Sequence, residues 1–311
     1  MLIATIPPPF RSSAMHIAYT PEVDALRFNT GVSVPDPQET IVALRKMIPP
    51  YKPLWIDLKC RQLRIASWGD PSFSEVKLNR EIEVDLPARI LFRGGHSSEI
   101  ARVEGKKIFL TDPPVQCVGR GQSVNILGEN LIVKGPLLAD LDWKYLEVCA
   151  RLGINHIMAS YIQTWEDVSG LVNVVSPNVQ LYLKIEDKAG VENIVCSAVG
   201  KHDDLHGIHL ELARDDLFTE LRSNFEEMKQ ATEQVIIRDP EALVASRLLP
   251  SMENGGEASL GDMTDIMFLY AAGYRNFMFQ DDMSNDPGIL RRAALTLRRC
   301  LGCAQGKGWQ S

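Results

Sequence analysis

Short β-type runs alternate with helix-compatible segments along most of this 311-residue chain, and this alternation constrains its fold more than any other feature. Alternating strands and helices are typical of a parallel sheet, because each helix returns the chain to the side where the next strand begins. The eight candidate strands are Leu2–Ile6, Ala25–Asn29, Pro53–Lys59, His156–Ile162, Gln180–Glu186, Gly207–Leu212, Leu243–Leu249 and Tyr274–Gln280. This count predicts an α/β fold, a closed (β/α)8 TIM barrel, with an open doubly wound sheet as the alternative.

Helical patterns follow most of these strands. The clearest are Glu39–Met47, Trp165–Val175, Val191–Val199 and Pro287–Cys300. The run Gln234–Arg238 fits either a short strand or the end of a helix that begins at Phe225, since periodicity cannot settle so short a run.

The segment 63–134 departs from the alternation and consists of strand patterns and turn signals. The candidate strands in it are Ile82–Leu86, Arg89–Arg93, Lys107–Leu110, Ser123–Leu127 and Leu131–Val133. We therefore predict a small all-β domain, residues 63–134, inserted after the third strand of a barrel domain that comprises residues 1–62 and 135–311.

Composition excludes several classes of partner. The formal net charge of −7 argues against nucleic acid and acidic membranes, because both need a basic surface. No apolar run reaches the roughly 18 residues of a transmembrane helix, so a cytoplasmic location is expected. Cys300 and Cys303 form a lone C-x-x-C near the end of the chain, which we interpret as free thiols. His202 and His206 lie four apart without the Glu of a metalloprotease helix, which favours a solvated turn.

Charged side chains recur at the carboxyl ends of the candidate strands, where the active site of a (β/α)8 barrel lies. Lys184 and Glu186 share a face of their strand because the side-chain period is two. Inside a barrel such a pair needs a metal or an anionic ligand, whereas a strand end that reaches into water needs neither. The further candidates are Arg27, Asn29, Asp57, Lys59, Glu211, Arg214, Asp215, Asp216, Ser246, Arg247, Gln280, Asp281 and Asp282. Together they predict a site for a hard divalent cation and an anionic substrate.

The residue sequences of several segments, and their order along the chain, resemble those of pyruvate kinase. The run Lys184–Val191 is close to that family's K-I-E-N-x-x-G-V, and Ala213–Leu217 with Glu220 matches most of A-R-G-D-L-G-V-E. The other similar segments are Leu2–Ile6, Arg27–Asn29, Asp57–Lys59 with Leu63 and Arg64, Ala159–Ile162 with Glu166–Val168, and Val244–Leu249 with Ser251 and Met252. The resemblance covers nearly the whole chain in order, and implies a barrel with a shortened β lid domain.

The resemblance also implies roles for particular residues. Glu186 and Asp216 are expected to hold a divalent cation, Mg²⁺ or Mn²⁺. Lys184 is expected to neutralise the charge of the phosphoryl group during its transfer. Arg27 is expected to hold the phosphate, with Arg64 beside it.

Ser246 stands where the family has a Thr near the proton that reaches the enolate carbon. Asn29 and Asp57 match half of a monovalent-cation site. Gly31 and Val32 replace the Ser and His of the family's R-L-N-F-S-H-G, which removes potassium ligands and nucleotide contacts and argues against a requirement for K⁺.

Asp215 replaces the glycine of A-R-G-D, where the backbone approaches the substrate carboxylate, and Glu211 replaces an apolar strand residue. A second carboxylate at Asp215 repels an anion unless it also binds metal. The family's C-terminal regulatory domain has no counterpart after the eighth helix, so its tetramer is not expected, although another oligomer is possible.

Three functions remain open on these residues. The first is Mg²⁺-dependent phosphoryl transfer of the pyruvate kinase kind, from phosphoenolpyruvate and ADP to pyruvate and ATP. The second is a metal-dependent lyase or aldolase-type enzyme that works through a pyruvate enolate. The third is a non-catalytic pyruvate-kinase homologue. The expected partners are a small anionic substrate and ADP or ATP, with no nucleic acid and no membrane.

Overall fold

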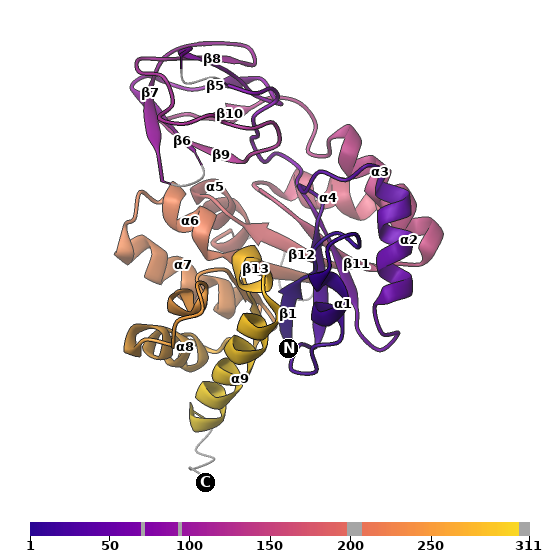
Figure 1. The fold of residues 1–311 in the computed structure, drawn as a ribbon. Coiled ribbons are helices and arrows are strands. Elements are labelled where there is room, and N and C mark those ends of the chain that lie inside the picture. The colour runs from indigo at the N-terminus through magenta and orange to yellow at the C-terminus, as the bar shows by residue number, and fades with distance from the viewer. Residues whose placement is uncertain (70–71, 93–94, 198–206, 305–311) are drawn as a thin grey trace.

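Eight parallel strands close into a barrel in the computed structural model, which describes residues 1–69, 72–92, 95–197 and 207–304 (Figure 1). The order around the barrel is β1-β2-β3-β11-β12-β13-β14-β15, and β15 pairs with β1. The strands are β1 Leu2–Thr5, β2 Ala25–Asn29, β3 Leu54–Leu58, β11 His156–Ala159, β12 Gln180–Ile185, β13 Ile208–Ala213, β14 Leu243–Ala245 and β15 Asn276–Met278. The closed barrel is confirmed, and the open sheet is wrong.

Helices connect the strands and pack on the outside of the barrel (Figure 1). They are α1 Ser13–Ala18, α2 Pro37–Met47, α3 Asp140–Leu152, α4 Trp165–Val174, α5 Lys188–Gly190, α6 Arg214–Glu220, α7 Phe225–Arg238, α8 Leu260–Ala272 and α9 Pro287–Ala304. Helix α4 begins at a capping box, because the Thr164 hydroxyl accepts from the Asp167 N–H while the Asp167 carboxylate accepts from the Thr164 N–H. None of the described helices is both long and apolar enough to cross a membrane.

One sequence ambiguity is settled by the helices. The run Gln234–Arg238 is the last part of α7, so the strand interpretation is wrong there. Helix α5 continues into a π-helical turn, η1 Val191–Val195, while the end of the predicted helix Val191–Val199 lies outside the described residues, as do His202 and His206. Short 3₁₀ turns, η3 Pro250–Met252 and η4 Asp281–Ser284, follow β14 and β15.

The segment between β3 and β11 forms antiparallel sheets, and we call residues 63–134 the inserted segment. One sheet has the order β4-β8-β7-β6-β9, and β5 pairs with β10 in a second. The strands are β4 Glu75–Lys77, β5 Ile82–Glu83, β6 Ala88–Phe92, β7 Ser97–Glu104, β8 Lys107–Leu110, β9 Val124–Leu127 and β10 Ile132–Val133. A hydrophobic cluster of its own, including Ile90, Ile108 and Ile126, fills this segment. Figure 1 places it beyond the end of the barrel that carries α5 and α6.

The interior of the barrel has an apolar floor and a charged upper layer. The floor is a separate buried cluster of Ile3, Ala25, Trp55, Met158, Tyr182, Leu243, Ala245 and Met278. Because successive inward side chains are two residues apart, the next inward position on β2, β3 and β12 is Arg27, Asp57 and Lys184. These three charged residues, all predicted from the sequence, therefore face the barrel interior, above the floor.

Candidate active site

Lys184 and Glu186 form a buried ion pair at the carboxyl end of β12. Lys184 Nζ lies 2.7 Å from Glu186 Oε1, and the side chains are 7% and 0% exposed. Lys184 also donates to Ser160 Oγ at 3.2 Å, and Glu186 Oε2 accepts from the Tyr161 N–H at 2.7 Å. Burial acts to lower the pKa of Lys184, but Asp57 and Glu186 outweigh it and raise that pKa, so the ammonium stays charged. The alternative of a solvated strand end is wrong for this pair.

The turn after β12 is built by the residues that follow the pair. Asp187 Oδ1 accepts from the Gly190 N–H at 2.8 Å and so caps α5. A Cβ at Gly190 would lie 2.8 Å from the Ile162 carbonyl oxygen, so only glycine fits this approach. The run that resembles K-I-E-N-x-x-G thus has a local structural reason for its last residue.

Asp57 is the centre of the charged layer. Its carboxylate, fully buried, accepts from Arg27 Nε at 2.8 Å, from Arg27 Nη2, and from Lys59 Nζ at 2.7 Å, and Lys184 Nζ lies 3.8 Å away. Burial acts to raise the pKa of Asp57, but Arg27, Lys184 and Lys59 together hold it well below its usual range. A carboxylate in this position interacts with three buried cations at once.

Arg27 contacts a second carboxylate, Asp281, from the start of η4. Arg27 Nη1 donates to Asp281 Oδ1 and, at 2.9 Å, to the Thr5 hydroxyl. Asn29 Nδ2 donates to Asp281 Oδ2 at 2.8 Å, and Thr5 donates to Asp281 Oδ1 at 2.9 Å. The pair proposed for a monovalent cation is thus engaged with different partners, Asn29 with Asp281 and Asp57 with Arg27 and Lys59.

A second acidic group lies where the inserted segment meets α6. Asn125 of β9 donates to Asp216 Oδ1 at 3.4 Å, to Glu220 Oε1 at 3.1 Å, and to the Tyr161 hydroxyl at 3.1 Å. Burial raises the pKa of Glu220 to about 8, and the charge of Asp216 contributes to the rise. Burial, with Asp216 as the leading like charge, raises the pKa of Glu186 to about 6. Glu186 and Asp216 are therefore close enough to interact, although they come from different elements.

Asp215 and Ser246 occupy the rim. The Asp215 side chain, 64% exposed, accepts from Arg247 Nε at 2.7 Å, and its N–H donates to the Ser246 hydroxyl at 2.9 Å. Ser246 in turn donates to the Ala245 carbonyl at 2.6 Å. Ser246 and Arg247 have φ values of +63° and +51°, a region that non-glycine residues seldom adopt and that recurs at functional sites.

Arg64 links the inserted segment to the loop after β2. Its Nη1 donates to the carbonyls of Gly31, at 3.1 Å, and Gly121, at 2.6 Å, and its Nη2 donates to Gln62 Oε1 at 2.5 Å. A Cβ at position 31 would lie 2.1 Å from Arg64 Nη2. Glycine at position 31 therefore leaves the room that this guanidinium occupies.

Glu211 is a fully buried carboxyl on β13, beside Lys184 in the strand register. None of the described residues donates a hydrogen bond to either of its oxygens. Burial raises the pKa of Glu211 to about 8, against the attraction of Lys184 and with the repulsion of Asp57 and Glu186. The carboxyl therefore holds its proton at neutral pH in the folded protein.

Replacing Glu211 by Gln is expected to flatten the pH dependence of stability. Its pKa is raised on folding from 4.5 to about 8, so the unfolded chain loses this proton first and stability falls as pH rises across that interval. Between pH 5 and pH 8 the wild type should lose about 2–4 kcal/mol more unfolding free energy than Glu211→Gln. Urea denaturation at both pH values measures this, and parallel losses in the two proteins would contradict the assignment.

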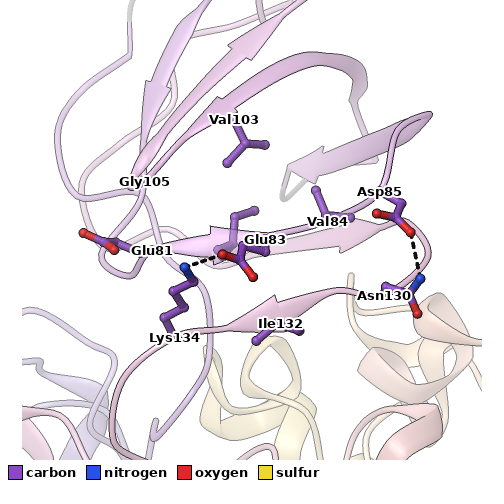
Figure 2. Close-up of a pocket in the computed structure, with 10 residues that line it drawn as sticks. Glu81, Glu83, Val84, Asp85, Val103, Gly105, Asn130, Ile132 and Lys134 are labelled. Carbon is purple, nitrogen blue, oxygen red and sulfur yellow. Dashed lines mark hydrogen bonds and ion pairs between the residues drawn. The ribbon is translucent and has the colours of Figure 1, made fainter.

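A hollow of about 520 Å³ lies within the inserted segment (Figure 2). It is lined by β5, β7 and β10, and Figure 2 shows Lys134 paired with Glu83 and Asn130 donating to Asp85. A smaller hollow between β9 and the barrel is lined by Asn125, Tyr161 and Glu220 among others. Its lining includes Asp187, the residue after Glu186, but not Lys184, Glu186 or Asp216 themselves.

The donor set at Glu186 and Asp216 fits a hard divalent cation. Mg²⁺ binds through one or two carboxylates and keeps several waters, so these two oxygen donors suit it. Burial and, after it, the repulsion by Asp216 raise the pKa of Glu186, and a cation between the two carboxylates would offset that repulsion. In the part of the chain that the structure describes, no three His, Cys, Asp or Glu side chains form a preassembled metal cluster.

The class of protein defined so far is a closed parallel (β/α)8 barrel with a network of buried charges at the carboxyl ends of its strands. No protein-family model matches the chain, and no curated protein matches it. The resemblance to pyruvate kinase thus remains a hypothesis that rests on the quoted motifs.

Sequence reasoning missed several members of the network. Thr5 and Ser160 lie two residues beyond inward-facing Ile3 and Met158, so the period of two could have found them. Asn125 carries no such signal, because the packing of the inserted segment alone brings it to α6.

Proposed function

We propose that this chain is a pyruvate-kinase-like phosphotransferase that moves a phosphoryl group between phosphoenolpyruvate and ADP with Mg²⁺. The observation that carries the proposal is the buried Lys184–Glu186 pair beside Asp216. A permanently charged ammonium next to two carboxylates suits a reaction in which a metal and a lysine share the charge of a transferred phosphoryl group.

Five residues of the site have a role in this proposal. Glu186 and Asp216 would hold Mg²⁺, which would supply Lewis-acid stabilisation of a pyruvate enolate. Lys184 stabilises the charge on the phosphoryl group in flight, and Asp57 keeps Lys184 charged and oriented. Ser246, whose hydroxyl lies on the rim, is assigned to the proton of the enolate carbon.

We assign the inserted segment the role of a lid domain. Two contacts support this role, the Asn125 amide on Asp216 and Glu220 and the Arg64 guanidinium on Gly31. Closure of such a lid excludes water from the reacting groups, which strengthens every charge interaction beneath it.

A second candidate, a metal-dependent lyase acting through a pyruvate enolate, is favoured by the pairing of Arg27. Its guanidinium is held by both Asp57 and Asp281, which leaves it less available to a phosphate. An enolate lyase needs the Glu186 and Asp216 metal pair but no phosphate anchor and no nucleotide contacts.

A coupled assay of ATP formation from phosphoenolpyruvate and ADP with Mg²⁺ tests the proposal. We expect turnover at equal rates in K⁺ and in Na⁺, because Arg27 and Lys59 already neutralise Asp57. No turnover at saturating substrates, with Mg²⁺ and pyruvate still binding in calorimetry, would contradict the kinase and leave the lyase. Absence of metal binding would contradict both and leave a non-catalytic protein.

A further inference from the structure

The carboxylate of Asp281 lies in a cradle of three donors that come from two neighbouring strands. The donors are the hydroxyl of Thr5 on β1 and the guanidinium and amide of Arg27 and Asn29 on β2. Arg27 and Thr5 contact Oδ1, and Asn29 contacts Oδ2, so both oxygens are engaged. Proteins bind small oxyanions in the same way, with a cationic side chain and neutral hydrogen-bond donors that together contact two oxygens of the anion.

Asp281 is the solvent-side partner of the cradle. Its side chain is 39% exposed, whereas the Arg27 side chain is 9% exposed and Asp57, on the other side of Arg27, is fully buried. Asp281 begins the short 3₁₀ turn η4 and not a barrel strand. A ligand that enters from solvent and seeks Arg27 therefore meets Asp281 first.

The charge balance of the layer gives the cradle a preference for an anion. Arg27, Lys59 and Lys184 bring three positive charges, and Asp57 and Glu186 bring two negative ones. Glu211 holds its proton at neutral pH, as argued above. The negative charge of Asp281 completes the balance, so its removal leaves one positive charge for an external anion to neutralise.

We propose that Thr5, Arg27 and Asn29 form an oxyanion site that Asp281 fills from within the chain, so that Asp281 sets the affinity for phosphate-bearing ligands. Asp281 competes with a phosphate in two ways, by occupying the donors and by repelling the incoming charge. The inference rests on the proposed function only for the choice of phosphate as the ligand class.

Inorganic phosphate is the probe, because its binding requires neither turnover nor a nucleotide. Isothermal titration calorimetry at constant ionic strength should show that Asp281→Asn tightens the dissociation constant for phosphate about tenfold or more relative to the wild type. Asp85→Asn removes the same charge from an exposed position on the inserted segment and should leave that constant unchanged. Equal phosphate affinity in the wild type and Asp281→Asn would overturn the proposal.

Two further measurements distinguish a failure to fold from a change in phosphate affinity. Asp281→Ser serves if Asp281→Asn does not fold, and the same tightening is expected. In thermal unfolding, with chloride at equal ionic strength as the reference for each protein, phosphate should raise the melting temperature of Asp281→Ser more than that of the wild type, and equal rises would overturn the proposal. These results do not depend on ATP formation, so a failure of the kinase assay leaves this test intact.

Discussion

Lys184→Met is expected to lower the rate of ATP formation by about 10³-fold, comparable to the loss of a cation that stabilises a phosphoryl transition state. Methionine keeps most of the length and apolar body of the side chain and removes the ammonium. That ammonium lies 2.7 Å from Glu186 Oε1 and 3.8 Å from Asp57 Oδ1, at the centre of the charged layer. The coupled assay under saturating phosphoenolpyruvate and ADP measures the effect.

A matched control for this variant is Lys188→Met. Lys188 follows the same strand, but its side chain is 64% exposed and pairs with Glu192 at 3.7 Å on the surface. Its replacement should leave the rate within about twofold of the wild type, since exposed ion pairs contribute little. A folded Lys184→Met protein with a wild-type rate would remove the phosphoryl-transfer role from Lys184.

Asp57→Asn should lower the unfolding free energy by about 3–5 kcal/mol, the range seen when one partner of a buried ion pair is removed. Asparagine fills the same volume, so the loss measures charge and not a cavity. Without the carboxylate, the cations of Arg27, Lys59 and Lys184 repel one another in a layer that water barely reaches. Urea denaturation at pH 7 measures the change.

Glu75→Gln is the corresponding surface change. Glu75 pairs with Lys107 at 3.0 Å, and both side chains are about half exposed, so less than about 1 kcal/mol should be lost. Losses of the same size in Asp57→Asn and Glu75→Gln would contradict the view that Asp57 stabilises the buried cations.

The barrel and most of its charged layer could be predicted from the sequence because both follow simple periods. Eight apolar runs separated by helical patterns define the sheet, and alternation within each run places Lys184 and Glu186 on one face. The inserted segment was harder. Strand β7, Ser97–Glu104, was missed because only two of its eight residues, Ser98 and Ile100, are buried, which leaves no clear alternation.

The pairing within the site could not be predicted, because it depends on distances between strands remote in sequence. Asp281 appeared as one of several polar residues after the eighth strand, yet its contacts with Thr5, Arg27 and Asn29 span more than 250 positions. The sequence predicts a strand up to Leu249, whereas φ values of +63°, +51° and +52° at Ser246, Arg247 and Leu249 end the strand at Ala245. Local residue preferences do not predict positive φ values at these three residues.

The sharing of Asp57 among three cations has a consequence for how this sequence can vary. A change at Arg27, Lys59 or Lys184 alone alters the charge around a carboxylate that is fully buried. The penalty for one unbalanced charge is a large part of the stability of a typical domain. Substitutions in this layer are therefore epistatic, and relatives of this chain should differ there by compensating pairs instead of by single changes.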